Sequence, residues 1–215
     1  MKFDYVDTAV VMPVYNGEDF LEDQLNSILN QTYQDFNLYI YDDLSTDNSR
    51  LIIERYREQD KRIFLITNRF RKGVIKNIND ALNEVNAEYY FLADQDDIWV
   101  GDKLKMQMKI LQDTETIMTF SNLELIDRDG MSIGKDFWKT MKINPVDANK
   151  PEIIALKSIV TGCTMGFKKK LLIKALPINE SAIMHDHWLS FFASSYKVKP
   201  IYDKLVLYRQ HQNNL

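Results

Sequence analysis

Short apolar runs alternate with helical runs along the first half of the chain, and this alternation limits the possible folds more than any other feature. Four near-continuous apolar stretches are typical of buried strands: residues 8–14, 36–41, 62–67 and 88–93. Between them, apolar residues recur at helical spacing, as in Leu21, Leu25 and Ile28. The β-α-β-α order predicts a single α/β domain with a mainly parallel sheet and helices on both faces.

Each predicted strand is followed by a polar cluster. The clusters read "YNGED", "DDLSTD", "NRFRKG" and "DQDD" in chain order. Since ligands of such sheets bind outside the carboxyl ends of the strands, we expect all four clusters to meet at one edge of the sheet.

The cluster "DQDD" carries the most specific chemistry. Asp94 and Asp96 lie two residues apart, so in an extended segment both side chains point the same way. Carboxylates are hard ligands, and we expect them to hold Mn²⁺ or Mg²⁺ whose other ligands are water and phosphate oxygens. The alternative is an acidic turn that precedes the next helix, near Gly101.

A second acidic cluster follows the second strand. Asp42 or Asp43 is placed to accept hydrogen bonds from a nucleobase or from a ribose hydroxyl. The alternative is an ordinary strand-to-helix turn in which Ser45 or Asp47 caps the helix. That alternative leaves two acids before the turn without a role.

Composition and missing motifs exclude several classes of protein. The 215-residue chain carries a net charge of −4, so no overall basic field attracts nucleic acid. It has no GxGxxG, GxxxxGK[ST], GxSxG or Cys/His cluster. One cysteine, no apolar run of about 20 residues and no leader-like start lead us to expect a cytoplasmic protein. Its abrupt end leaves open a longer parent chain.

The second half of the chain is less regular. A fifth strand is predicted over residues 116–122, followed by a polar loop in which Phe137 and Trp138 are expected to be exposed. A helix is expected from Lys168 onward, and another within "MHDHWLSFFAS". The run of lysines at residues 168–170 is typical of a solvated helix start, with contact to anionic lipid as the alternative.

Five ordered motifs together resemble family 2 glycosyltransferases with the GT-A fold, which is Rossmann-like. The stretch "VVMPVYNGEDFLEDQLNSILNQTYQDFNLYIYDDLSTDNS" resembles the N-terminal region of the family. "ADQDDIW" resembles its DxD motif in the form found in rhamnosyltransferase-like bacterial members. "VTGCTMG" resembles its acceptor loop, "HDHWL" its catalytic-base motif, and "YRQHQNN" its C-terminal segment.

The resemblance implies a role for each matching position. It divides the domain into a nucleotide-sugar-binding half, residues 1–122, and an acceptor-binding half, residues 123–215. Asp186 is implied as the catalytic base, Asp96 and His211 as metal ligands, and Gly162 and Trp188 as acceptor-binding residues. The implied nucleotide-sugar-binding residues are Pro13, Tyr15, Asn16, Asp42, Asp43, Lys76, Asp94 and Gln95.

Three positions depart from the family pattern. Leu44 stands where the family often has glycine, which alters the turn after Asp43. Lys76 stands in place of an arginine, keeping the charge and losing the planar fork. His185 precedes Asp186 where an acid is common, so the base assignment rests on Asp186 alone.

The resemblance implies an inverting transfer of a sugar, from dTDP-rhamnose or a UDP-sugar, to a glycan or lipid-linked acceptor in bacterial surface polysaccharide synthesis. A non-catalytic nucleotide-sugar-binding module remains the alternative, although an intact Asp186 favours the enzyme. A nucleotidyltransferase is the other alternative. Such enzymes have a Gly-rich loop with arginine after the first strand, and "MPVYNG" is not such a loop.

Overall fold

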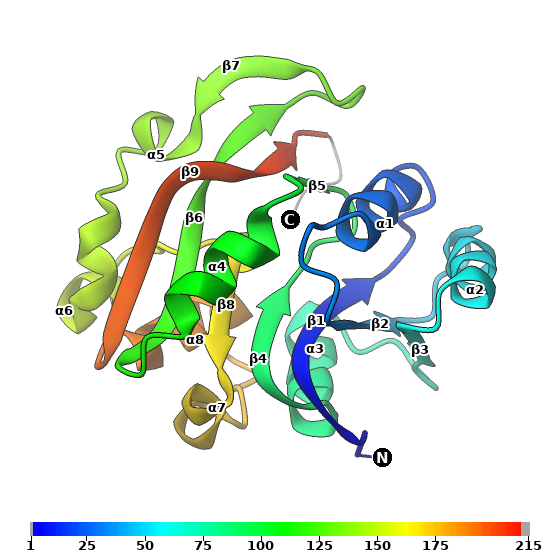
Figure 1. The fold of residues 1–215 in the computed structure, drawn as a ribbon, viewed down its shortest axis with the longest axis horizontal. Coiled ribbons are helices and arrows are strands. Elements are labelled where there is room, and N and C mark those ends of the chain that lie inside the picture. Colours follow the sequence, from blue (N-terminus) through cyan, green and yellow to red (C-terminus); the bar gives the residue numbers. More distant parts are fainter. Residues whose placement is uncertain (1, 212–215) are drawn as a thin grey trace.

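The computed structural model describes residues 2–211, which form a nine-stranded mixed sheet between helical layers (Figure 1). The strand order is β3-β2-β1-β4-β8-β6-β9-β5, with β7 paired to β6. The strands are β1 (Tyr5–Val14), β2 (Asn37–Asp42), β3 (Ile63–Thr67), β4 (Asn86–Leu92), β5 (Ile98–Trp99), β6 (Thr116–Ile126), β7 (Ser132–Asp136), β8 (Met165–Lys168) and β9 (Lys197–Arg209).

Eight α-helices and two 3₁₀ helices connect these strands within the described residues. The α-helices are α1 (Leu21–Leu29), α2 (Ser49–Gln59), α3 (Val74–Glu84), α4 (Lys103–Leu111), α5 (Phe137–Thr140), α6 (Pro151–Ile154), α7 (Lys169–Ala175) and α8 (His185–Ala193). The 3₁₀ helices are η1 (Pro145–Asn149) and η2 (Gly162–Thr164). No helix among residues 2–211 is long and apolar enough to cross a membrane.

The four strands expected from the apolar runs are confirmed, and they pair in parallel. In the register, Ala9 of β1 lies between Asn37 of β2 and Tyr90 of β4. The central residues of β1 are fully buried, because a strand covered on both faces shows no solvent-facing side. All four strands therefore end at the same edge, as the polar clusters require.

One strand of the second half interrupts the expected pattern. β8 runs antiparallel between β4 and β6, so the fifth predicted strand, which extends to Ile126 as β6, does not pair with β4. The reason is local: η2 leads directly into β8 from the carboxyl edge of the sheet, without a crossover helix that would return the chain to the other edge.

The helices cover both faces of the sheet with two separate cores. One face packs on α1, α2 and α4, with Leu25, Ile53 and Leu104 buried there. The other face packs on α3, α6, α7 and α8, with Leu82 and Leu189 among its buried residues. Both cores are apolar, which explains the amphipathic spacing in the sequence.

β9 returns the chain to the edge where β4 ends. It pairs in parallel with β6 along its length, and near its end it pairs with β5, which directly follows the "DQDD" segment. The exposure expected for Phe137 and Trp138 is wrong: Phe137 is partly buried against both cores, and Trp138 is 6% exposed with its ring beside Phe120. Helix α5 turns this ring inward toward the sheet.

Gly166 of β8 makes room for an aromatic ring of β4. A Cβ atom at Gly166 would lie 2.4 Å from the ring of Phe91, inside a fully buried layer. We expect Gly166→Ala to lower the free energy of unfolding by about 1–3 kcal/mol, because the ring has no space to move. Urea denaturation measures this loss. Gly101→Ala is the matched control, since no atom lies within 4 Å of its added Cβ; equal losses in both variants would contradict the packing argument.

Candidate functional site

A cavity of about 400 Å³ opens at the carboxyl edge of the sheet. It lies where β1 and β4 end, facing η2 and the start of α8. The residues that line it are Pro13, Val14, Tyr15, Asp43, Arg71, Gly73, Val74, Asn77, Asp94, Gln95, Asp96, Thr161, Gly162, Met184, His185, Asp186 and Tyr208. Both halves of the chain thus contribute to one cavity.

Gln95 locks the ends of β1 and β4 together. Its Oε1 accepts from the backbone N–H of Tyr15 at 2.8 Å, and its Nε2 donates to the carbonyl of Tyr15 at 3.0 Å. Gly17 lets this side chain approach, since a Cβ there would lie 2.7 Å from the amide of Gln95. The amide is therefore engaged within the chain, although Gln95 lines the cavity as the nucleotide-sugar-binding prediction requires.

Asp43 anchors the loop between β3 and α3. Its carboxylate accepts from the backbone N–H groups of Lys72 and Gly73, each at 2.8 Å, and from Asn68 Nδ2 at 2.8 Å. This loop places the guanidinium of Arg71 at 3.7 Å from the centre of the Tyr15 ring. A role in binding a base or ribose stays a prediction for Asp43, which faces the cavity while holding the loop.

Three of the predicted nucleotide-sugar-binding residues do not line the cavity. Asn16 has a left-handed backbone, with φ of 48°, and its Oδ1 accepts from the N–H of Thr46. Asp42 is buried and accepts from the N–H of Ser45. Lys76 lies 3.2 Å from Glu180 at the surface. Arg71, instead of Lys76, is the basic residue that lines the cavity. It belongs to the cluster "NRFRKG", which the sequence predicts to lie at this edge of the sheet.

Negative charge is concentrated in the cavity. Asp94 and Asp96 line it from the end of β4, and Asp186 lines it from α8. Burial, followed by the charges of Asp96 and Asp186, raises the pKa of Asp94 to about 7. Carboxylates this close together favour the binding of a cation.

His211 closes the carboxylate side of the site. Its Nε2 lies 2.8 Å from Asp96 Oδ2, and its ring packs on Phe20 with centroids 4.8 Å apart. Asp96 and His211 are 115 positions apart in the chain. The rest of the "YRQHQNN" motif, residues 212–214, lies outside the described residues.

Arg209 is the buried residue that brings His211 to this position. Its Nε donates to the carbonyl of Asp96 at 2.9 Å, and its backbone N–H donates to Asp97 Oδ1 at 3.2 Å. Its other guanidinium nitrogens reach the carbonyl of Arg128 and the carboxylate of Asp23. The side chain of Arg209, which is 1% exposed, therefore joins the "DQDD" segment, α1 and the turn between β6 and β7.

The Asp96–His211 pair suits a divalent cation. Adjacent ligands of a six-coordinate Mg²⁺ or Mn²⁺ lie about 3 Å apart when metal–ligand bonds are about 2.1 Å long. Asp96 Oδ2 and His211 Nε2 are in direct hydrogen-bond contact at 2.8 Å, close to that spacing. Carboxylate oxygen with imidazole nitrogen is a donor set that Mn²⁺ accepts.

A second group of donor atoms lies behind the cavity. One donor atom each from Asp94, Asp97 and Cys163 fall within 4.8 Å of one another. Burial raises the pKa of Asp97 and of Cys163, so both groups favour their protonated forms, which are poor ligands. Of the two groups, the Asp96–His211 pair is the better candidate to hold a cation, because Asp96 lines the open cavity.

Lys103 is a buried amine beneath the "DQDD" segment. Its Nζ donates to Gln107 Oε1 at 2.7 Å and lies 3.9 Å from the centre of the Trp99 ring. The side chain has no exposed surface, and burial lowers the pKa of Lys103 to about 7. Its charge faces Asp97 and Cys163.

This depressed pKa of Lys103 predicts a pH-dependent stability. The unfolded chain keeps Lys103 protonated up to about pH 10.4, whereas the folded chain releases that proton near pH 7. The unfolded state binds more protons between these values, so the contribution of Lys103 to stability rises with pH. We expect wild type to gain on the order of 2–4 kcal/mol relative to Lys103→Met from about pH 7 to about pH 10.

Denaturant unfolding of both proteins across this pH range measures the gain. Lys105→Met is the control, because Lys105 is exposed on the same helix. Parallel stability curves for wild type and Lys103→Met would contradict the burial argument.

Asp186 is held at the start of α8. Its Oδ2 accepts from the N–H of Gly162 at 3.0 Å, and its Oδ1 accepts from the N–H of His187 at 2.6 Å. A Cβ on Gly162 would lie 3.0 Å from the ring of His185, so glycine allows this close approach. Burial lowers the pKa of His185, which favours the neutral imidazole beside the carboxylate.

Trp188, predicted to bind the acceptor, does not line the cavity. Its Nε1 donates to the carbonyl of Ala175 at 2.7 Å, joining α8 to the end of α7. Sequence reasoning missed several residues that face the cavity: Asn77, Thr161, Met184 and Tyr208. Asn77 belongs to "IKN", and its amide fastens α3 to the carbonyl of Tyr41.

The sequence matches a known family over most of its length. The sequence model of glycosyl transferase family 2 covers residues 9–176. The dTDP-rhamnosyl transferase RfbG of Shigella flexneri is 31% identical over 94% of this chain and 72% of its own length. The UDP-Glc:alpha-D-GlcNAc-diphosphoundecaprenol beta-1,3-glucosyltransferase WfgD of Escherichia coli is 33% identical over 61% of this chain and 51% of its own.

Solved structures confirm the GT-A fold. The mannosyltransferase PcManGT from Pyrobaculum calidifontis, in complex with GDP-Man and Mn²⁺, superimposes with a TM-score of 0.76 at 20% identity. That match covers 98% of this chain and 59% of the other. The chain spans 51% of the length of WfgD and 60% of the length of another curated relative that it matches.

Proposed function

Because the chain belongs to glycosyl transferase family 2, we propose that it is a metal-dependent, inverting glycosyltransferase of bacterial surface polysaccharide synthesis. The donor would be a nucleoside-diphosphate sugar, and the acceptor a hydroxyl group of a glycan or of a lipid-linked saccharide. The observation that carries the proposal is the meeting of Asp94, Asp96 and Asp186 at one cavity, from segments about 90 residues apart.

The donor side of this reaction would use residues from the first half of the chain, the proposed nucleotide-sugar-binding half of residues 1–122. The ring of Tyr15 and the guanidinium of Arg71 form a flat, cationic surface suited to a nucleotide. Arg71 also offers the planar fork that pairs with phosphate oxygens, the property that Lys76 lacks. We therefore assign Arg71 the contact with the diphosphate, in place of Lys76, which was predicted to bind the nucleotide sugar.

Asp96 and His211 would hold Mn²⁺ or Mg²⁺, which neutralises charge on the departing nucleoside diphosphate when it is bound. Asp94 would accept hydrogen bonds from the sugar or ribose hydroxyls beside it. Arg209 would keep the "DQDD" backbone and His211 in register, because its guanidinium and its backbone N–H contact that segment.

Asp186 would act as the base on the acceptor side, the proposed half of residues 123–215. Two backbone N–H groups fix its carboxylate, and it lines the same cavity as Asp94. As the acceptor oxygen attacks the anomeric carbon, Asp186 would take the hydroxyl proton, and the nucleoside diphosphate would leave from the opposite face. Attack opposite the leaving group inverts the anomeric carbon.

The base and the sugar of the donor remain open between two candidates. RfbG is named for dTDP-rhamnose and WfgD for UDP-glucose, so likeness to both supports either nucleotide. The "ADQDDIW" form favours dTDP-rhamnose. A cytoplasmic enzyme at the inner face of the membrane would meet both the donor and a lipid-linked acceptor.

A product assay tests the proposal against its alternatives. The protein is incubated with dTDP-rhamnose or UDP-sugars, Mn²⁺ and candidate acceptors, and the nucleotide products are separated. Release of a nucleoside diphosphate with a glycosylated acceptor is expected. Release of pyrophosphate would indicate a nucleotidyltransferase, and donor binding without any product would indicate a non-catalytic module.

A further inference from the structure

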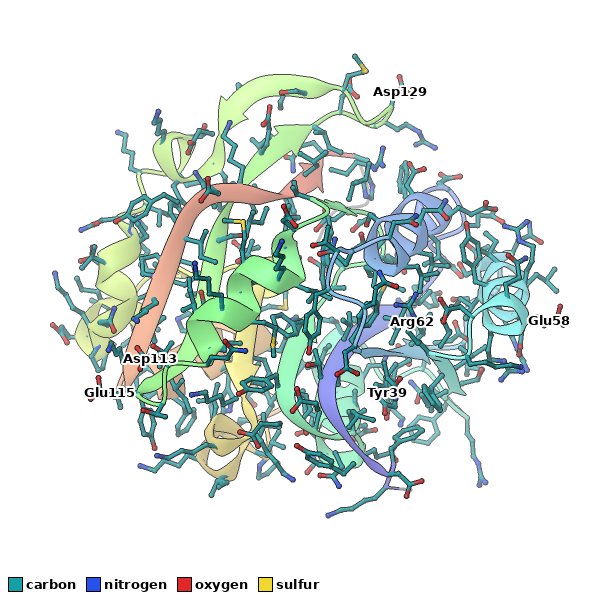
Figure 2. The ribbon with its side chains drawn as sticks, viewed as in Figure 1. Tyr39, Glu58, Arg62, Asp113, Glu115 and Asp129 are labelled. Atoms are coloured by element: carbon teal, nitrogen blue, oxygen red, sulfur yellow. The ribbon has the colours of Figure 1, made fainter. Side chains whose placement is uncertain are left out.

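Charge is distributed unevenly over the chain. Residues 139–174 contain eight lysines and two acidic residues, whereas residues 1–60 contain four basic and 13 acidic residues. The basic segment runs through α5, α6 and α7, on the opposite side of the molecule from α1 and α2 (Figure 1). Glu58 marks the acidic side, at the end of α2 (Figure 2). These two segments thus differ strongly in charge although the net charge of the chain is small.

The basic side includes a layer of three helices that lie next to one another. His187 Nε2 of α8 lies 2.7 Å from the carbonyl of Ile154 in α6, and Trp188 of α8 bonds to the last residue of α7. This layer covers one core of the protein with its inner surface. Its outer surface, which we call the α6–α8 face, includes the segments that follow α6 and precede α8.

The α6–α8 face exposes large apolar side chains. Leu156 is 90% exposed, Ile183 80%, Ile173 79% and Phe191 40%. Single exposed apolar residues are common, but four on adjoining elements in a basic region are not explained by folding.

Four lysines accompany these apolar residues: Lys157, Lys169, Lys170 and Lys174. No ion pair among the described residues uses any of them. Lys157 and Lys169 donate to neutral oxygens, and Lys170 and Lys174 lie over the ring of Tyr196. By contrast, Lys197 and Lys199 are paired with Asp113, which Figure 2 labels. These four lysines therefore have no acidic partner among the described residues, and the exposed acids Glu152 of α6 and Glu180, which pairs with Lys76, leave them unneutralised.

Lysines beside exposed aliphatic and aromatic residues suit the surface of an anionic membrane. The ammonium groups would lie at the lipid phosphates, and the apolar side chains would enter the boundary between headgroups and acyl chains. A soluble polyanion would use the lysines and leave Leu156 and Ile183 without a role. The combination favours lipid.

The α6–α8 face adjoins the acceptor side of the cavity. Ile183 is followed directly by Met184, and Lys157 is four residues from Thr161; Met184 and Thr161 both line the cavity. We infer that this face docks on an anionic phospholipid surface, which would bring the acceptor side of the cavity to a lipid-linked saccharide. The part of this inference that concerns the acceptor rests on the proposed function.

Vesicle sedimentation tests the docking without donor or acceptor. The probes are vesicles of phosphatidylcholine alone and vesicles with equal amounts of phosphatidylglycerol and phosphatidylcholine. Wild type is expected to bind the second and not the first, with binding that weakens as salt is added. Charge reversal of Lys157, Lys170 and Lys174 to Glu is expected to weaken binding by at least about 10²-fold, since the loss of each lysine alone removes a factor of about five.

Control variants distinguish the effect of this face from the effect of a changed net charge or of fewer exposed apolar residues. Reversal of Lys61, Lys105 and Lys109 changes the net charge equally at exposed sites elsewhere, and should retain most of the binding. Leu156→Gln with Ile183→Gln should weaken binding, whereas Leu51→Gln with Met131→Gln, at exposed sites elsewhere, should not. Thermal melting checks that every variant is folded.

Three results would overturn the inference. They are failure of wild type to bind the anionic vesicles, equal losses in the control variants, and unchanged binding after the Leu156 and Ile183 substitutions. The last, together with displacement by soluble polyglutamate, would indicate a polyanionic partner in place of lipid. Vesicle binding by a protein that transfers no sugar would refute the proposed function alone, so the two failures are distinguishable.

Discussion

Asp186→Asn is expected to lower the rate of sugar transfer by about 10²- to 10⁴-fold while donor affinity stays unchanged. The amide keeps the shape of the side chain and its oxygen can still accept from the N–H of Gly162, although its NH2 group no longer accepts from the N–H of His187. It cannot take a proton from the acceptor hydroxyl, so only the chemical step should suffer. Steady-state kinetics measure the rate, and calorimetry with the donor measures the affinity.

Asp203→Asn serves as the control for the Asp186 experiment. Asp203 is an exposed carboxylate on β9, outside the residues that line the cavity, so its loss should leave transfer unchanged. Near-normal turnover of Asp186→Asn would place the base elsewhere. A fall in donor affinity equal to the fall in rate would indicate that Asp186 binds the donor.

Arg209→Met is expected to lower the free energy of unfolding by on the order of 2–5 kcal/mol and to weaken Mn²⁺-dependent donor binding. The substitution removes the partners of the Asp96 and Arg128 carbonyls and of Asp23. Asp23 is half-exposed and regains water, so most of the loss comes from the part-buried carbonyl groups of Asp96 and Arg128. Donor binding should fall because the carbonyl of Asp96 loses its hydrogen bond to the side chain of residue 209, two residues before His211.

Arg128→Met is the matched control, since the side chain of Arg128 is 62% exposed and its pair with Asp19 lies at the surface. Exposed pairs contribute about 0–1 kcal/mol. Arg209→Lys keeps the charge without the fork and should give an intermediate loss. If Arg209→Met lost stability and kept the full Mn²⁺ effect on donor binding, Arg209 would be structural only.

The first half of the fold could be predicted from local patterns. The buried strands are continuous apolar runs, and the intervening helices repeat at 3.6-residue spacing, so β1 to β4 follow from the sequence. The carboxyl-edge rule then placed Asp94 and Asp96 at a common site. These inferences need only neighbouring residues and a general property of parallel sheets.

The second half could not be predicted in this way, because its placement depends on distant contacts. β8 has four residues, too few to show periodicity, and its position between β4 and β6 is set by pairing with strands far along the chain. Trp138 was expected to be exposed because its neighbours are polar, yet the ring packs on Phe120.

The site residues also divide into those that local patterns predict and those that depend on distant contacts. Asp43 was expected to face a ligand, and its hydrogen bonds to the β3–α3 loop could not be foreseen from a local pattern. Arg71 was hidden in a cluster of three arginine or lysine side chains before Gly73. The pairing of His211 with Asp96 was suggested by family resemblance alone, because nothing local links residues 115 positions apart.

Calorimetric titration of dTDP-rhamnose and of UDP-glucose, with and without Mn²⁺, tests the central claim most directly. Wild type should bind one of these donors more tightly when Mn²⁺ is present, and Asp96→Asn should lose that gain while keeping its folded structure. Asp129→Asn, at an exposed carboxylate (Figure 2), should behave like wild type. Equal donor affinity with and without Mn²⁺ in wild type, or an undiminished Mn²⁺ effect in Asp96→Asn, would contradict a cation held by Asp96 and His211.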